Sequence, residues 1–174
     1  LNNGILIHMP FDQKIISGGI TKNPCVIFSQ ITFEDKITEK KSKLTGYNQY
    51  LNNTLITHND SANTNQLFDV DISTGAVTRT VTITNASNSD WEDLTHDETY
   101  IYIGDFGNYE GDRTNLKVYR IAIADYFAST SITADIINFS YSNQTDFTPS
   151  PLATNFDAEG LIHFNNTLYV FSKN

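Results

Sequence analysis

The sequence predicts an all-β fold assembled from repeated four-stranded antiparallel units. Short apolar segments are separated by Asn, Asp, Gly and Ser, and no helical period extends beyond a turn or two. One phrase also occurs twice: residues 90–94 read Asp-Trp-Glu-Asp-Leu, and residues 157–161 read Asp-Ala-Glu-Gly-Leu. In both copies a tyrosine-bearing apolar strand begins seven residues after the leucine, at Ile101 and at Leu168. The repeat therefore predicts a duplicated hairpin that carries a duplicated Asp-x-Glu pair.

The predicted strands follow in chain order from the alternation of side chains and from the turns between them. The first unit has strands at 55–57, 66–71 and 77–84. The second unit has strands at 93–94, 100–103, 116–121 and 132–141. The third unit begins at Phe156 and runs through a turn at Asn165 and Asn166 to Phe171. The third unit thus contains only the first hairpin of the pattern.

Corresponding positions in the first two units lie 46 to 50 residues apart, as in the pairs Leu55 with Ile101 and Thr64 with Thr114. Four strands per unit at this period are typical of β-propeller blades. Because propellers close with about four to eight blades, two and a half units predict a fragment of a larger propeller. A β-sandwich is the competing architecture, but it does not explain why the hairpin recurs.

The repeat divides the chain into two parts. Residues 47–174 form the predicted propeller portion, which is truncated within its last blade. Residues 1–46 match the repeat poorly and are expected to hold a partial blade, with strands near 5–7 and 26–33. We expect both ends to be cuts in a longer polypeptide or assembly.

Composition excludes several classes of function. The formal net charge of −9 disfavours a nucleic-acid partner, because phosphate binding needs a basic face. Cys25 is the single cysteine, which rules out an internal disulfide and a cysteine-rich metal site. The apolar runs are too short for a transmembrane segment.

Several phrases together resemble a family of secreted or surface bacterial six-bladed propeller modules. The phrases that carry the resemblance are residues 57–61, 90–93, 104–108 with Arg113, 118–121, 157–159, Tyr169 and 172–173. The resemblance implies a secreted or cell-surface protein. Such modules are mostly uncharacterised, and they are distantly similar to propellers with phytase-like, lactonase or esterase-like activity. A shared fold does not transfer an activity.

The Asp-x-Glu pairs are the main candidates for chemistry. Strand alternation predicts that Asp90 and Glu92 point to one face while Trp91 and Asp93 point to the other. Antiparallel pairing places Asp90 near Asp105, and it places Glu159 near Ser172. If these hairpins are the inner pairs of neighbouring blades, equivalent carboxylates meet at one mouth of a central channel.

Converging carboxylates repel one another unless a cation intervenes, and oxygen ligands suit Ca²⁺ or Mg²⁺. The predicted metal ligands are Asp90, Glu92, Asp105, Asp157 and Glu159. The predicted ligand-binding residues at the same mouth are Asn59, Asp60, Asn108 and Arg113. Arg113 offers another way to neutralise the carboxylates. A purely structural hydrogen-bond network is the alternative for the Asp-x-Glu pairs.

Two aromatic residues near this mouth allow two interpretations each. His58 is a candidate general base, because the histidine pKa lies near neutrality, and a turn-stabilising histidine is the alternative. Trp91 is expected to pack between blades rather than to serve as a substrate platform.

The leading functional hypothesis is a binding or scaffolding module with Ca²⁺ at the carboxylate-rich mouth and a protein or glycan ligand. The first alternative is a metal-dependent hydrolase acting on a phosphoester, lactone or ester, in which the cation polarises the substrate or activates water. The second alternative is a structural segment of a large assembly. No nucleophile and base pair is evident in the sequence, which favours binding over catalysis.

Overall fold

The structure is a computed structural model, and it describes residues 44–51, 54–71, 73–151 and 153–173. Side chains are described from Leu55 onward. Most of the predicted N-terminal segment 1–46, including the strands expected near 5–7 and 26–33, lies outside the described residues. Almost all regular structure in the described part is β-strand, so the all-β prediction is confirmed.

The first sheet contains the first unit of the repeat. Its strands lie in the order β1-β2-β3-β4-β8, and all pair antiparallel except β8, which pairs parallel to β4. The bounds are Leu44–Leu51 for β1, Thr54–Asn59 for β2, Gln66–Val70 for β3, Val77–Ile83 for β4 and Ser131–Ile132 for β8. β1 has no counterpart among the strands predicted from the sequence, because residues 44–51 contain no Asp-x-Glu phrase.

The second sheet contains the second unit, and the third sheet contains the duplicated hairpin. The second sheet has the antiparallel order β5-β6-β7-β9, and the third pairs β10 with β11. The bounds are Trp91–His96 for β5, Tyr100–Asp105 for β6, Lys117–Ala122 for β7, Asp135–Asn138 for β9, Ala158–Phe164 for β10 and Thr167–Ser172 for β11. A short helix α2, Ile123–Ala128, follows β7.

The single strand predicted over 132–141 is wrong. The chain forms two short strands there, and they belong to different sheets, because β8 pairs with β4 whereas β9 pairs with β7. Asn85 causes the break: its side-chain amide donates to Ala134 O at 2.8 Å, and its Oδ1 accepts from Ala134 N at 2.9 Å. These two hydrogen bonds hold Ala134 between β8 and β9, where the chain passes from one sheet to the other. The alternation of side chains along a strand cannot predict a contact over this distance in the sequence.

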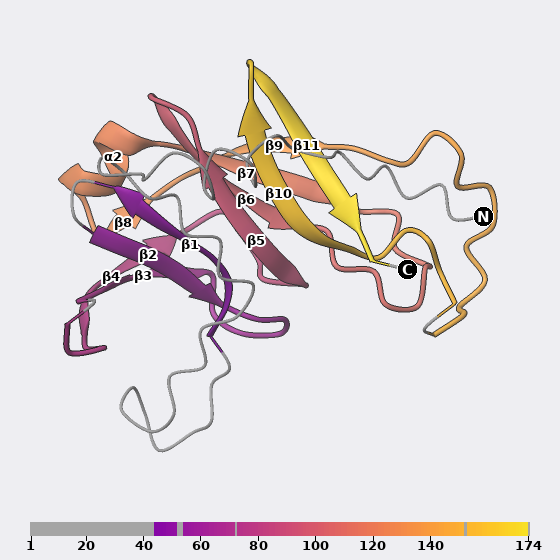
Figure 1. The fold of residues 1–174 in the computed structure, drawn as a ribbon, viewed down its shortest axis with the longest axis horizontal. Helices are drawn as coiled ribbons and strands as arrows, with labels where there is room; N and C mark the ends of the chain where they lie inside the picture. The colour runs from indigo at the N-terminus through magenta and orange to yellow at the C-terminus, as the bar shows by residue number, and fades with distance from the viewer. Residues whose placement is uncertain (1–43, 52–53, 72, 152, 174) are drawn as a thin grey trace, which may run out of the picture.

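Successive sheets are arranged as a fan, with the first strand of each beside the first strand of the next (Figure 1). β5 contacts β1 on one side and β10 on the other. Over the described residues the sheets form an open series, so the closed propeller stays a prediction. No helix among the described residues is long and apolar enough to cross a membrane.

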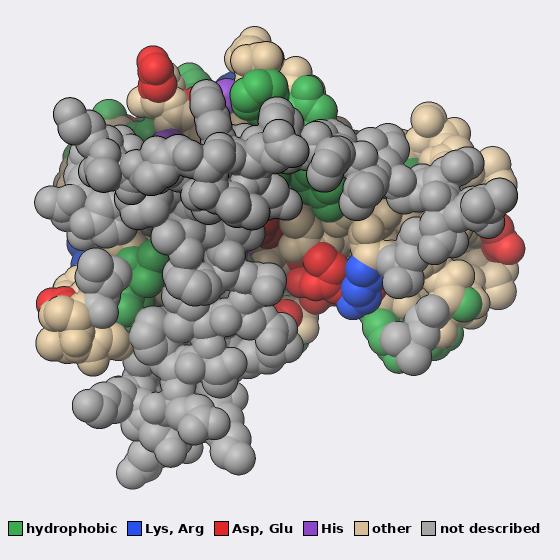
Figure 2. Space-filling view, in the orientation of Figure 1, with side chains coloured by type: hydrophobic (Ala, Val, Ile, Leu, Met, Phe, Trp, Pro, Cys, Tyr) green, Lys and Arg blue, Asp and Glu red, His purple; other side chains and the backbone are tan. Residues whose placement is uncertain are grey.

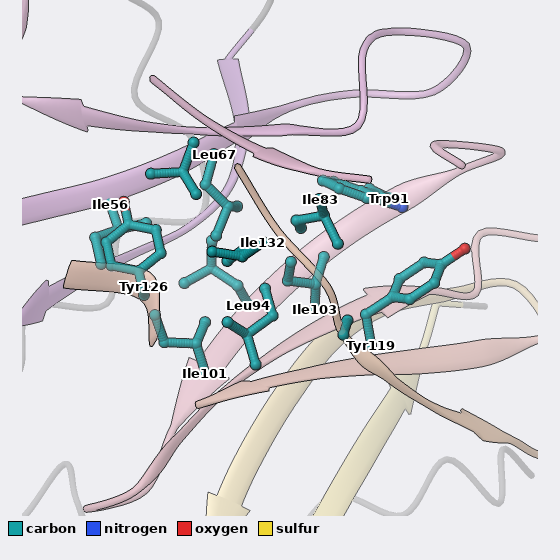
Figure 3. Close-up of a cluster of buried hydrophobic side chains, with 13 residues drawn as sticks. Ile56, Leu67, Ile83, Trp91, Leu94, Ile101, Ile103, Tyr119, Tyr126 and Ile132 are labelled. Atoms are coloured by element: carbon teal, nitrogen blue, oxygen red, sulfur yellow. The ribbon is translucent and has the colours of Figure 1, made fainter. Parts of the chain in front are cut away.

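Two apolar cores hold the fan together, one on each face of the second sheet. Alternation in β6 directs Ile101 and Ile103 into the core shared with the first sheet, and Tyr102 into the core shared with the third. Figure 3 shows the first of these cores, where Ile56 and Leu67 of the first sheet pack near Leu94 and other side chains of the second sheet. Each fully buried Leu or Ile contributes about 1.5–3 kcal/mol relative to an exposed one. Apolar contact therefore positions the strands that carry the polar residues.

Trp91 packs between the first two sheets, as predicted. Its side chain is fully buried and lies edge-on to the ring of His58, with centroids 5.7 Å apart. Its indole N–H donates to Ser87 O at 2.9 Å, which satisfies the one polar atom of the ring. The start of β5 is thereby fixed against the end of β2.

Candidate functional site

The two Asp-x-Glu pairs occupy equivalent positions at β-bulges. Trp91 pairs with Asp105 and Asp93 with Gly104, so Glu92 is the extra residue of β5. Ala158 pairs with Ser172 and Gly160 with Phe171, so Glu159 is the extra residue of β10. A bulge bends its strand and redirects the side chain of the inserted residue. The repeat in the sequence is therefore a repeat of irregular backbone as well as of residue type.

The bulge corrects the faces expected for β5. Strict alternation predicted Trp91 and Asp93 on the same face, and this prediction is wrong. Trp91 enters the core shared with the first sheet, whereas Asp93 Oδ2 accepts from Leu161 N of the third sheet at 2.7 Å. The extra residue between them shifts the phase of the strand, which reverses one of the two side chains.

Acidic residues gather at the edge of the sheets where the first strand of a sheet begins and its second strand ends. Asp60 follows β2, Asp90 precedes β5, Asp105 ends β6 and Asp157 precedes β10. We use the name acidic rim for six residues: Asp60, Asp90, Glu92, Asp105, Asp157 and Glu159. The predicted proximity of Asp90 and Asp105 is confirmed, because Asp90 N donates to Asp105 Oδ1 at 3.1 Å. Ser172 lies opposite Ala158, beside Glu159.

Three members of the rim form a compact group, which we call the carboxylate triad: Asp60, Asp90 and Glu92. One carboxylate oxygen from each lies within 4.8 Å of the others. Gly107 lies directly against the group, since a Cβ there would lie 2.2 Å from Glu92 Oε1 and 2.3 Å from Asp90 Oδ2. Only glycine fits at this point without moving the carboxylates.

The electrostatics of the triad disfavour negative charge. Burial raises the pKa of Glu92 well above its usual value, and the charges of Glu159, Asp90, Asp60 and Asp157 raise it further. Burial also raises the pKa of Asp90, and Arg113 partly opposes this effect. An added cation would relieve both the repulsion and the cost of desolvation.

Elsewhere on the rim, carboxylates have cations of their own. Arg113 binds Asp105 at 2.8 Å, and Lys173 binds both Asp157, at 3.0 Å, and Glu159. Hydrogen bonding to Glu159 raises the pKa of Lys173. Figure 2 shows acidic and basic side chains in contact near the place where Figure 1 draws the end of β11. Within the described part of the chain, the triad residues have no ion pair, unlike Asp105, Asp157 and Glu159.

The predicted ligand-binding residues Asn108 and Arg113 are engaged in holding the loop after β6. Arg113 donates to Gly107 O at 2.6 Å, and its own backbone N–H donates to Asn108 Oδ1 at 2.9 Å. The backbone N–H of Asn108 donates to Asp157 Oδ1 at 2.7 Å, which ties this loop to the third sheet. These contacts fix the loop that carries Gly107 against the triad.

The first sheet reaches the rim through residues 58–60. His58 is fully buried, and burial lowers its pKa to about 4; its Nδ1 lies 2.9 Å from Asn59 O. The Asn88 side chain donates to Asn59 O and to Asp60 O, each at 3.0 Å. A neutral, enclosed imidazole suits the turn-stabilising role that the sequence analysis held as the alternative to a general base.

Several buried polar atoms around the rim have no hydrogen-bond partner among the described residues. They are His58 Nε2, Asn59 Oδ1 and Asp105 Oδ2. An unsatisfied buried acceptor costs about 1–3 kcal/mol. The two oxygens are of the type that coordinates a hard cation, and Asp105 lies against Asp90 through its other oxygen.

Three residues that contribute to the site are not among those predicted from the sequence: Asn88, Gly107 and Lys173. The hairpin register predicted Glu159 beside Ser172, and extending it by one residue would have indicated Lys173. Asn88 acts through long-range side-chain hydrogen bonds to the backbone of residues 59 and 60, and Gly107 acts by leaving room for the carboxylates, and neither role has a local signal in the sequence.

A scan of protein-family models finds no match, and comparisons with curated proteins and with solved structures find no significant relative.

Proposed function

We propose that this protein is a β-propeller binding module, secreted or cell-surface, that holds one Ca²⁺ at the carboxylate triad and uses it to bind a protein or glycan ligand. The observation that carries the proposal is that Asp60, Asp90 and Glu92 converge from two sheets with no ion pair in the described part of the chain. A bound cation with open coordination positions attracts carboxylate or hydroxyl oxygens of a partner.

The propeller part of the proposal rests on repetition. The bulged hairpin recurs in the second and third sheets, and neighbouring sheets pack face to face through apolar cores. First strands lie side by side along the series, as inner strands of blades do. Further blades would continue the fan into a ring.

The choice of calcium rests on the donor set. All three triad side chains offer carboxylate oxygens, and Asn59 Oδ1 and Asp105 Oδ2 are further unpartnered oxygens nearby. Oxygen ligands in flexible arrangements at 6–8 positions favour Ca²⁺ over Mg²⁺, which demands octahedral geometry. Zinc prefers nitrogen and sulfur ligands, which the triad does not offer.

Binding is favoured over hydrolysis by the position of His58. A general base must reach the proton that it removes. The imidazole of His58 is fully enclosed between the first two sheets and neutral near pH 7. The hydrolase alternative, like the structural-segment alternative, has no comparable support.

The first prediction concerns calcium and stability. In cation-free buffer at pH 7.5, Glu92→Gln should raise the melting temperature. The pKa of Glu92 is higher in the folded than in the unfolded protein, so the wild type loses stability as pH rises above the unfolded-state pKa, near 4.5. Calcium should raise the melting temperature of the wild type and leave that of Glu92→Gln nearly unchanged. Differential scanning fluorimetry with isothermal titration measures both effects.

Glu98→Gln is the matched control, since it makes the same chemical change at an exposed position of the turn after β5. This variant should respond to calcium as the wild type does. Absence of both heat and thermal shift in the wild type would remove the calcium site from the account.

A further inference from the structure

Lys173 stands at a distinctive place on the acidic rim. Its Nζ contacts Asp157 at 3.0 Å and also Glu159, from the residue that directly follows β11. Its side chain is 52% exposed, so the amine reaches the carboxylates from the solvent side. Two carboxylates of the third sheet thereby share one internal cation.

The carboxylates that Lys173 neutralises are electrostatic neighbours of the triad. Both Glu159 and Asp157 act on Glu92, and Asp157 also acts on Asp90. Because Lys173 contacts both of these carboxylates, its positive charge offsets part of the negative charge that acts on the triad.

One member of the acidic rim has a buried oxygen without a hydrogen-bond partner among the described residues. Asp105 is fully buried, its Oδ1 receives Asp90 N–H and the Arg113 guanidinium, and its Oδ2 has no partner among the described residues. Most buried polar atoms in native structures have a hydrogen-bond partner, and a bound cation would supply the one that this oxygen lacks.

We propose that Lys173 is a built-in counter-cation that divides the acidic rim, so that the wild type holds a single dication at the triad with reduced affinity. This inference rests on the proposed calcium site and specifies what limits it. Removing the amine frees Asp157 and Glu159, which then strengthens cation binding and adds capacity for a second ion.

The test is isothermal titration of the full chain with CaCl₂ for four proteins: wild type, Lys173→Met, Lys173→Arg and Arg120→Gln. Lys173→Met should bind calcium about tenfold more tightly, or should bind two ions where the wild type binds one. Lys173→Arg keeps the charge and should behave as the wild type does. Arg120→Gln removes one positive charge near the other end of β6 and β7, and should also behave as the wild type does.

Each outcome decides a separate statement. A wild type that binds calcium, with equal affinity and stoichiometry in Lys173→Met, overturns the role of Lys173 and leaves the calcium site standing. If neither protein binds calcium, both proposals fail. If only Lys173→Met binds, the wild type holds no dication, which overturns both the proposed calcium site and the statement that Lys173 leaves one ion at the triad. Circular dichroism of each variant checks that the fold is retained.

Discussion

Glu92 is a partly buried and His58 a fully buried ionisable residue near the same strand ends, and burial opposes the charged form of each. For Glu92 this raises the pKa, while for His58 it lowers the pKa to about 4. Near neutral pH without a cation, both side chains are held in their uncharged forms. Their contributions to stability therefore change with pH in opposite directions: as pH rises, the contribution of Glu92 falls and that of His58 rises.

The second prediction concerns His58 and acid. Between its unfolded pKa of 6.5 and its folded pKa of about 4, the unfolded chain takes up a proton that the folded chain does not. Stability from this group is complete above pH 6.5 and falls as pH drops, by about 3 kcal/mol at the acid end. Because the Glu92 contribution grows over the same range as pH falls, urea unfolding at pH 7.0 and pH 4.5 measures the His58 contribution as the difference between the wild type and a variant that lacks the imidazole.

The variant His58→Asn should flatten this part of the pH profile, because asparagine retains a donor for Asn59 O but does not titrate. It should be less stable than the wild type at pH 7, since it packs less well against Trp91. Parallel pH profiles for the two proteins would show that His58 is not the group responsible.

At the scale of secondary structure, the bulges connect neighbouring sheets. The bulge in β5 releases Asp93 from the core shared with the first sheet, and its Oδ2 accepts from Leu161 N. Its Oδ1 accepts from Leu94 N at 2.9 Å. One buried carboxylate thus satisfies donors on two sheets, near the strand ends that carry Glu92 and Glu159.

The third prediction follows from this contact. Asp93→Ala should lower the free energy of unfolding by about 1–3 kcal/mol, because the buried N–H of Leu161 loses its acceptor. Asp93→Asn keeps an acceptor oxygen and should lose less. Chemical denaturation gives the stabilities, and amide hydrogen exchange at Leu161 reports the local effect. Unchanged exchange at Leu161 in Asp93→Ala would contradict the role of Asp93 in joining the two sheets.

Repetition made the hairpins predictable, and long-range contacts made the rest unpredictable. The equivalence of Asn59 and Asp105, each the last residue of a second strand, could be derived because turns and periods are local signals. The split into β8 and β9 could not, since it depends on Asn85, which contacts residues 49 positions away. The bulges also escaped prediction, because alternation assumes regular pairing.

At the scale of the whole molecule, the fan of sheets is what brings the acidic residues together. The triad draws Asp60 from the first sheet and Asp90 and Glu92 from the second, while Asp157 and Glu159 come from the third. The sequence predicted this convergence from the repeat alone. It did not predict how the charges divide, because Arg113 and Lys173 act through pairings that only the assembled sheets create.

The division of charge has a consequence for the entire rim. Asp105, Asp157 and Glu159 form ion pairs with Arg113 and Lys173. The triad is the part of the rim at which an added cation could bind. The sheets must stay packed face to face for the triad to form, since its members come from different sheets. Binding of calcium should therefore report on the integrity of the fan.

A crystal structure of the protein grown in millimolar CaCl₂ tests the central statement most directly. The account predicts one ion bound by oxygens of Asp60, Asp90 and Glu92 at about 2.3–2.6 Å, bridging the first two sheets. Ordered triad carboxylates with no ion between them, or sheets that do not neighbour one another through β1, β5 and β10, would contradict it.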